Sequence, residues 1–390
     1  MAATANAVPA STVRITYQDF LRTGPGTLAG RYLRMFWQPV YRASELTAGR
    51  AKPLRIMSED FTLYRGEGGD VHLLAFRCAH RGTQLSTGWV EGDNLRCFYH
   101  GWVYGPDGQC VEQPAEPEPF CQRIKIRSFP TREYLGFVFA YLGEGEAPEF
   151  PRLPEFEHPE YVNELSMLMW PGNYFTQLDN SVDEGHTAIT HWHFGRGMPE
   201  QISTEDTDYG IRLMTTGPGY GVPDHFCMPN AHEWGAPPRP GAQDLWSYAR
   251  GWRVPIDDQH YYRFGINVVP ITGDAADEYR ERTAARAAKI KRPGSEVAED
   301  VLKGLLPPSE LKPEVYPDLV NIQDYIAQVG QGDIANHPHD EHLGRSDVGV
   351  IRIRGLWARE LQALAEGRPL RQWRRPDVLW NDMSAAGRTT

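Results

Sequence analysis

The sequence contains 390 residues, of which 41% are hydrophobic and 11% aromatic, a composition typical of a globular protein with room for two domains. Its formal net charge of -11 argues against nucleic acid as a partner, because phosphate binding requires a concentrated basic surface. No run of about 18 apolar residues occurs, and the N-terminus lacks a basic region followed by an apolar stretch, so we expect no membrane span and a cytoplasmic location.

The N-terminal region has a helical pattern. Between Tyr17 and Val40 apolar residues recur at mixed helical spacing, and Gly24-Pro25-Gly26 interrupts them. We therefore expect residues 1–36 to form a helical entry segment.

Short strands dominate residues 37–145. Apolar runs alternate with turns rich in glycine, aspartate and proline, such as Gly105-Pro106-Asp107-Gly108. The predicted strands are Leu54–Ile56, Phe61–Tyr64, Val71–Phe76, Leu95–Phe98, Trp102–Tyr104, Ser128–Pro130 and Leu135–Tyr141. This pattern predicts a small antiparallel all-β domain.

Two mixed pairs of cysteine and histidine lie within this region. They are Cys78 with His80 and Cys97 with His100, separated by sixteen residues, and a glycine follows each pair within two positions. Two thiolates and two imidazoles on short loops are the ligands of a Rieske [2Fe-2S] cluster, in which cysteines hold one iron and histidines the other. The alternative is a structural zinc site, although zinc sites usually combine two C-x-x-C or H-x-x-x-H pairs. The other three cysteines have no disulfide-like spacing and are expected to be ordinary buried thiols: Cys110, Cys121 and Cys227.

The second half of the chain predicts an α+β domain. Residues 146–160 are rich in proline and glutamate and are expected to form the linker, and residues 161–390 form the second domain. Its strands are predicted at Ile211–Thr216, His225–Pro229 and Tyr261–Pro270. Residues 275–315 are predicted to form a helical surface insertion, and Val348–Glu366 an amphipathic closing helix.

A second metal site is indicated by His186 and His191. Two histidines and a later carboxylate make the facial triad of a non-haem Fe(II) oxygenase. Residues five apart on a regular helix are rotated by about 140°, so the two histidines require a π-type turn or a broken helix between them. Asp183 lies three residues before His186 and is placed to accept a hydrogen bond from a ligand imidazole. His193 is rejected as a ligand because its helical position lies about 10 Å along the axis from His186.

The two motifs in this order, C-x-H with C-x-x-H and N-x-x-D-x-x-H-x-x-x-x-H, resemble the alpha subunit of Rieske non-haem iron oxygenases. The segments 20–27, 173–183 and 341–347 resemble the phthalate dioxygenase-like branch, which has no beta subunit. The resemblance implies an N-terminal all-β Rieske domain followed by an antiparallel-sheet and helix domain of the helix-grip, START-like type. It also implies a head-to-tail homotrimer in which His100 of one subunit contacts Asp183 of the next, and it assigns a catalytic role to Asp183 and Asn180.

The third iron ligand implied by the resemblance is Asp324, although the sequence alone leaves Asp333 and Asp340 open.

The function implied is that of a terminal oxygenase, which uses O2 and electrons from NAD(P)H to hydroxylate an aromatic compound, in particular an aromatic acid. The chain has no G-x-G-x-x-G fingerprint, so a flavin or ferredoxin-type reductase is expected as a partner. O- or N-demethylation by a Rieske monooxygenase is an alternative, and an electron carrier without oxygenase activity is a remote one.

Substrate choice is expected to depend on apolar side chains after His191, whose bulk suits a planar ring. The candidates are Met214, Phe226, Met228, Tyr262 and Phe264. A buried arginine would indicate a carboxylated substrate, and Arg212 and Arg263 are the candidates.

Overall fold

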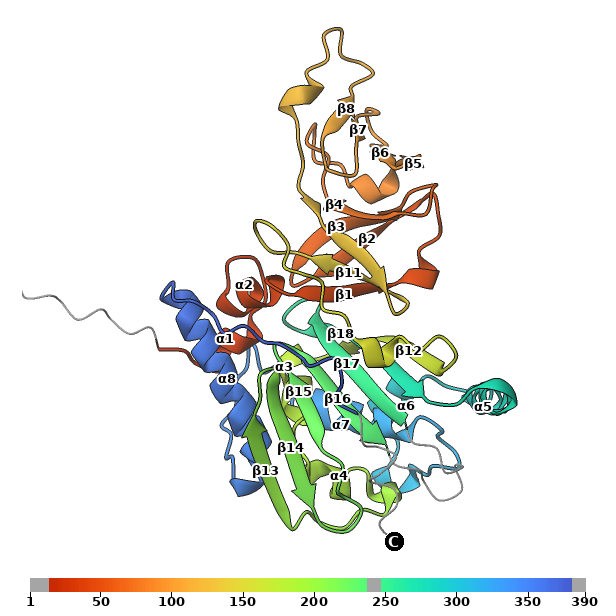
Figure 1. Cartoon of the computed structure of the whole chain (residues 1–390), viewed down its shortest axis with the longest axis vertical. Helices are drawn as coiled ribbons and strands as arrows, with labels where there is room; N and C mark the ends of the chain where they lie inside the picture. The colour runs from red at the N-terminus through yellow and green to blue at the C-terminus, as the bar shows by residue number, and fades with distance from the viewer. Residues whose placement is uncertain (1–13, 237–246, 381–390) are drawn as a thin grey trace, which may run out of the picture.

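The computed structural model describes residues 14–236 and 247–380. Its elongated shape has three small sheets at one end and one seven-stranded sheet at the other (Figure 1). No helix within the described ranges has the length and apolar character needed to cross a membrane.

The chain enters through two short helices. These are α1 (Gln18–Leu21) and α2 (Leu28–Arg34), and the Gly24-Pro25-Gly26 segment separates them. The Thr27 hydroxyl accepts a hydrogen bond from the Gly30 amide and caps α2. The helical pattern predicted to Val40 is wrong beyond α2, because strand β1 (Trp37–Arg42) pairs with β11 (Phe137–Tyr141). Burial of Val40 against this neighbour outweighs the local helical spacing.

Three antiparallel sheets form the N-terminal part. The first has the order β1-β11-β10, the second β2-β3-β4-β9, and the third β5-β6-β7-β8. The remaining strands are β2 (Arg50–Ile56), β3 (Glu59–Arg65), β4 (Val71–Ala75), β5 (Trp89–Glu91), β6 (Asn94–Arg96), β7 (Val103–Tyr104), β8 (Cys110–Glu112), β9 (Ser128–Phe129) and β10 (Thr131–Tyr134). The third sheet lies at the tip of the molecule (Figure 1) and has its own small core, which includes Cys78 and Cys97.

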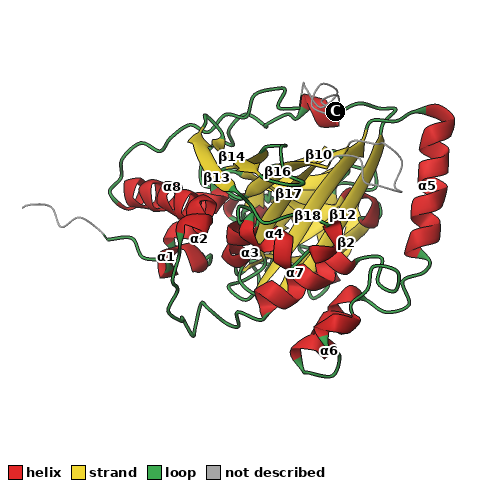
Figure 2. Ribbon diagram, turned by 90° about the horizontal axis from the view of Figure 1, so that it is seen from below, coloured by secondary structure: helices red, strands yellow, loops and turns green. Residues whose placement is uncertain are grey.

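The C-terminal part is built on one antiparallel sheet of seven strands in the order β12-β18-β17-β16-β15-β14-β13. The strands are β12 (Val162–Pro171), β13 (Gln201–Asp206), β14 (Gly210–Thr216), β15 (Asp224–Cys227), β16 (Ala231–Ala236), β17 (Ser247–Pro255) and β18 (His260–Val269). The helices are α3 (Tyr174–Asn180), α4 (Gly185–Ile189), α5 (Gly273–Ala287), α6 (Gly294–Leu302), α7 (Leu319–Val329) and α8 (Val348–Ala365). Figure 2 shows α3, α4 and α7 gathered over this sheet.

Two connecting segments are more closely packed than their composition indicates. The segment between β11 and β12 buries four side chains, Leu142, Phe150, Leu153 and Phe156, although it has neither strand nor α-helix. Within the segment predicted as a surface insertion, α5 is exposed along most of its length and stands away from the sheet (Figure 2). In contrast, α6 buries Val297 and Ala298 in the main core and packs on α7, so the prediction is wrong for α6.

The two faces of the seven-stranded sheet have different partners. Phe264 on β18 and Trp252 on β17 lie opposite each other and contact β11 of the N-terminal part. The ring centroids of Phe264 and Phe137 are 5.5 Å apart, and those of Trp252 and Phe139 are 5.7 Å apart. Because side chains alternate along a strand, Arg253 and Arg263 point to the other face, toward the helices.

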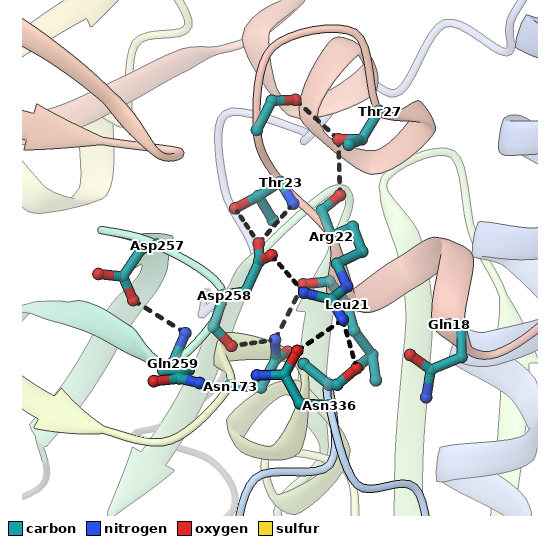
Figure 3. Close-up of polar contacts among 12 residues, drawn as sticks. Gln18, Leu21, Arg22, Thr23, Thr27, Asn173, Asp257, Asp258, Gln259 and Asn336 are labelled. Carbon is teal, nitrogen blue, oxygen red and sulfur yellow. Dashed lines mark hydrogen bonds and ion pairs between the residues drawn. The ribbon is translucent and has the colours of Figure 1, made fainter.

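A polar network fixes the start of α3 (Figure 3). Asp258, in the turn between β17 and β18, accepts hydrogen bonds from the Thr23 amide and from Arg22. The Asn173 side chain donates to the carbonyls of Leu21 and Asp258, while its Oδ1 caps α3 by accepting from the Phe175 amide. The chain entry and the sheet therefore hold the helix that leads into His186.

Candidate metal centres

The two cysteine and histidine pairs lie on matching loops at the tip of the molecule. In one loop the Gly82 amide donates to the carbonyl of Cys78, and in the other the Gly101 amide donates to the carbonyl of Cys97. Both glycines have a left-handed backbone, with φ of +75° and +73°. The loops bring the rings of His80 and His100 to a centroid distance of 4.5 Å.

The surroundings of these loops suit a buried cluster with exposed histidine edges. Cys78 and Cys97 are 3% and 1% exposed, whereas both histidines are half-buried. Burial, and then the neighbouring Cys78 thiol, raise the pKa of Cys97, and the buried Nδ1 atom of His80 has no hydrogen-bond partner. Thiols of this kind lose their protons when they bind metal, so the unsatisfied donor set fits a metal cluster.

Two aromatic residues that the sequence did not single out support the loops. The ring of His80 stacks on Trp102, with a centroid distance of 4.6 Å and an interplanar angle of 6°. The Tyr104 hydroxyl lies 3.2 Å from Sγ of Cys78 and accepts a hydrogen bond from the Ala79 amide. The alternation of the strand after Gly101 places both rings toward the loops, a signal available from the sequence once the ligands are assigned.

The second constellation consists of His186, His191 and Asp324. One ligand atom from each of these residues lies within 4.8 Å of the other two. Oδ1 of Asp324 is 3.2 Å from Nε2 of His191 and 3.8 Å from Nε2 of His186. The structure does not bring Asp333 or Asp340 into this group; Asp333 instead bonds Asn336 and Gln259 near the surface.

The helix between the two histidines is broken, as their spacing requires. α4 ends at Ile189, and His191 leaves it with φ -101° and ψ 41° before a 3-10 turn from Trp192 to Phe194. This break turns His191 toward Asp324, which α7 supplies from a distant part of the chain. No π-helix occurs in the described residues, so the broken helix is the alternative that the structure adopts.

Each histidine is oriented by a hydrogen bond from its Nδ1 atom. His186 donates to the main-chain carbonyl of Asp183, whose carboxylate Oδ2 lies 3.5 Å away. His191 donates to Oε1 of Gln323 at 2.9 Å. The Nε2 atom of each ring therefore faces Asp324 and is the nitrogen left to bind a metal, the arrangement that metal-binding histidines need. Asn180 on α3 places Nδ2 3.3 Å from Nε2 of His186.

The electrostatics of the site favour charged ligands. Burial would raise the pKa of Asp324, but the neighbouring His191 ring and the charges of Arg263 and His186 lower it below its ordinary value. Oδ1 of Asp324 is nevertheless a buried atom without a hydrogen-bond partner. A buried, ionised and unsatisfied carboxylate oxygen beside two imidazole nitrogens fits a divalent metal ion.

A cavity of about 930 Å³ opens beside these three residues. It is lined by polar groups from α3, α4, β16, β17, β18 and α7 and from the segment between α6 and α7. Arg286 and Pro313 belong to the lining, so the segment predicted as a surface insertion contributes to this wall.

None of the five apolar residues predicted to contact substrate lines this cavity. Tyr262 and Phe264 lie on the face of β18 that contacts the N-terminal part, and Met214 lies on the same face of β14 as Arg212. Phe226 and Met228 are buried in the main core. Apolar bulk alone does not reveal which face of a strand meets the cavity.

Of the two arginine candidates for binding a carboxylated substrate, one lines the cavity and the other does not. Arg263 lines the cavity and donates to Oδ1 of Asn321 at 2.8 Å. Arg212 lies on the outer face of β14, beside Glu205. A third arginine, Arg253, also lines the cavity but was not predicted.

Known proteins resemble this chain over most of its length. Residues 36–130 match the Rieske [2Fe-2S] domain. Over 91% of its length the chain is 31% identical to the tert-butanol monooxygenase / tert-amyl alcohol desaturase oxygenase subunit of Aquincola tertiaricarbonis, covering 78% of that protein. It is 30% identical, over 88% of its length, to the phenoxybenzoate dioxygenase subunit alpha of Ectopseudomonas oleovorans, covering 84% of it.

The chain belongs to the oxygenase subunits of the Rieske oxygenases.

The fold of this Rieske oxygenase has counterparts among solved structures. NdmA of Pseudomonas putida CBB5 superposes with a TM-score of 0.65 and 21% identity, over 86% of this chain and 93% of that one. The predicted order of an all-β Rieske domain and an antiparallel-sheet and helix domain is thereby confirmed, as is the resemblance read from the motifs. Figure 1 also shows that the cluster loops of this oxygenase, beside β6 and β7, and helix α4 lie toward opposite ends of the molecule.

Proposed function

We propose that this oxygenase subunit holds its [2Fe-2S] cluster with Cys78, His80, Cys97 and His100, and one Fe(II) ion with His186, His191 and Asp324. The observation that carries the proposal is the unsatisfied Oδ1 atom of Asp324, which faces two oriented imidazole nitrogens in a cavity wall. These three residues would hold Fe(II), which when bound would supply the chemistry of O2 activation, because a two-histidine, one-carboxylate triad leaves coordination positions open.

The neighbouring residues position the ligands. Asp183 holds the His186 ring through its main-chain carbonyl, and its carboxylate accepts the Gly185 amide at 3.0 Å, which fixes the turn before α4. Asn180 approaches the same ring from α3 and is itself held by Gln177 at 3.0 Å. In this proposal Asp183 and Asn180 are positioning residues for the iron site, and Asp183 also links it to the cluster.

Electron transfer in this proposal runs between subunits of a head-to-tail homotrimer. The cluster loops and α4 are too widely separated along the molecule for contact within one chain (Figure 1). Both regions expose apolar side chains suited to an interface: Phe98 and Tyr99 beside His100, and Ile189 and Trp192 around His191. His100 of one subunit would then contact Asp183 of the next, whose side chain is 30% exposed.

The partners and domain limits follow from the same proposal. NAD(P)H supplies the electrons through a flavin or ferredoxin-type reductase, since the chain contains no dinucleotide fingerprint of its own. We assign residues 1–36 to the entry segment, 37–145 to the Rieske domain, 146–160 to the linker and 161–390 to the catalytic domain.

The substrate in this proposal is a small aromatic compound, because the cavity is large enough for one ring with substituents. The two relatives named above are a monooxygenase and a dioxygenase, so hydroxylation of the ring and monooxygenation, including demethylation, use the same site. The products distinguish them, since demethylation releases formaldehyde and ring dihydroxylation does not.

Iron analysis of anaerobically purified protein tests the proposal. Three irons per chain are expected in the native protein and two in Asp324→Ala, with an unchanged reduced-cluster spectrum and no oxygen-dependent product. Zinc in place of iron, or a native level of mononuclear iron in Asp324→Ala, contradicts the assignment.

A further inference from the structure

Three arginines line one wall of the cavity beside the iron site. Arg253 on β17 and Arg263 on β18 are direct partners in the antiparallel register, and Arg286 comes from the end of α5. Because partners in antiparallel strands project from the same face, the guanidinium groups of Arg253 and Arg263 share one side of the sheet. Like charges placed opposite each other repel, so this arrangement needs a compensating anion.

The protein itself does not supply that anion. Among the residues that the structure describes, no carboxylate lies within 4.0 Å of the guanidinium group of any of these three arginines. Arg263 donates only to the neutral amide of Asn321, and Arg286 donates to the main-chain carbonyl of Pro317. Buried or half-buried charges in proteins are normally paired, which makes Arg253 and Arg263 unusual, whereas Arg286 is exposed.

Of the three arginines, Arg253 has the most buried hydrogen-bond donors without a partner. It is 2% exposed, its Nη2 donates to Oγ of Ser181 at 3.1 Å, and its Nε and Nη1 atoms have no partner. Burial, and then the charge of Arg263, lower the pKa of Arg253 to about 9, so it still carries its proton at neutral pH. A Cβ atom on Gly251 would lie 2.2 Å from Nη1, which means that a glycine in β17 provides the room for this guanidinium.

Two carboxylates that line the cavity, Asp318 and Asp324, interact electrostatically with this wall, but neither neutralises it. Burial raises the pKa of Asp318, which disfavours its charged form. Asp324 interacts electrostatically with Arg253 and Arg263, but in the proposed function its charge is committed to Fe(II). Glu184 and Asp224 also line the cavity, accompanied by Arg196. Burial raises the pKa of Glu184 to about 8, so this acid is largely protonated at neutral pH and an anionic group in the cavity is attracted to the arginine wall.

We propose that the arginine wall is a carboxylate subsite, in which Arg263 binds the carboxylate of an aromatic acid and Arg253 supplies a fixed positive charge behind it. The inference rests on the proposed function, because it names the substrate class of the same cavity. The planar fork of a guanidinium matches a carboxylate in two parallel hydrogen bonds, which favours this anion over a neutral amide of the same shape. Arg253 and Arg263 thus act as specificity residues, and the ring of the acid extends toward the iron ligands.

Binding of acid and amide pairs to the holoenzyme without reductase tests the subsite separately from catalysis. The probes are benzoate against benzamide and phenylacetate against phenylacetamide, measured by isothermal titration calorimetry. We expect at least one acid to bind ten or more times more tightly than its amide. Arg263→Gln should remove this preference while leaving amide affinity unchanged, Arg253→Gln should reduce it, and Arg263→Lys should retain part of it.

Arg212→Gln is the matched control, since Arg212 is an arginine on the same sheet but on the outer face. It should leave the preference intact, and the cluster absorbance of every variant reports correct folding. Equal binding of acids and amides by the native enzyme, binding of neither acid, or an equal loss in Arg212→Gln overturns the subsite. An intact acid preference in a protein that consumes no O2 would instead contradict the proposed function alone.

Discussion

Gln323 and His191 are joined by a hydrogen bond of 2.9 Å from Nδ1 of the imidazole to Oε1 of the amide. Gln323 immediately precedes Asp324 on α7, so two consecutive residues of one helix contact the ring of His191. The amide holds one ring nitrogen while the carboxylate faces the other at 3.2 Å. The position of α7 therefore determines both the third ligand and the tautomer of the second.

Gln323→Leu is expected to lower mononuclear iron affinity by about 10- to 100-fold, because His191 loses the acceptor that fixes its tautomer. Iron content after dialysis against a graded chelator series measures the change, and the cluster spectrum should stay native. Gln331→Leu, at an exposed position just beyond α7, is the control. Equal iron retention by the two variants contradicts a role for Gln323.

Asp183→Asn should keep both metal centres but slow the oxidation of the reduced cluster by O2 and substrate at least tenfold. The main-chain carbonyl of Asp183 still holds His186, whereas the negative charge offered to His100 of the partner subunit is lost. Stopped-flow absorbance of the cluster in a single turnover gives the rate. An unchanged rate, or an active monomer in sedimentation, would count against the route between subunits.

Tyr104→Phe should lower the reduction potential of the cluster by tens of millivolts. The hydroxyl lies 3.2 Å from Sγ of Cys78, and a hydrogen bond to a cluster sulfur stabilises the reduced, more negative state. Spectroscopic redox titration measures the shift. Tyr134→Phe, in the same part of the fold but bonded to Glu157, is the matched control and should leave the potential unchanged.

The sequence predicted which polar residues come together better than it predicted their surroundings. C-x-H, C-x-x-H and the two histidines are local patterns whose chemistry follows from residue type, and the structure brings His186 and His191 together with Asp324. The choice among Asp324, Asp333 and Asp340 needed family resemblance, because the late carboxylate reaches the site only through the packing of α7 against the sheet.

The cavity wall was harder to predict. Tyr262 and Arg263 are neighbours on β18, yet Arg263 faces the cavity and Tyr262 does not line it. A shift of one residue along a strand moves a side chain to the other face of the sheet. Hydrophobic patterning cannot decide which face meets the cavity when both faces of the sheet are covered. Arg253 was missed for the same reason, since its neighbours in sequence give no sign of a buried, unpaired charge.

Acidification should destabilise the fold partly through His225. Burial in the core lowers the pKa of His225 to about 4, whereas the ring of the unfolded chain titrates near 6.5. Between these values the unfolded chain binds a proton that the native state does not, so stability is lost as the pH falls, by about 1.4 kcal/mol per unit. The difference in urea midpoints between pH 7.5 and pH 5 should shrink in His225→Gln and remain in the exposed control His337→Gln.

Arg375 secures the C-terminal end of the described chain through a buried ion-pair network. It donates to Oε1 of Glu233 at 2.7 Å and to Oε2 of Glu155 at 2.5 Å, and Glu233 is fully buried. Among the described residues, Arg375→Met leaves Glu233 with Arg250 as its one ion-pair partner, a loss expected to cost about 3–5 kcal/mol because a buried charge becomes undercompensated.

The matched control is Arg371→Met, four residues earlier, which removes an ion pair with Asp208, a side chain that is 91% exposed. That loss should cost less than about 1 kcal/mol, since water screens exposed pairs. Unfolding midpoints in urea, followed by tryptophan fluorescence, compare the two variants. Similar midpoints would mean that the network containing Glu233 contributes no more than a surface contact, and that the core beneath Trp380 holds the C-terminal segment without it.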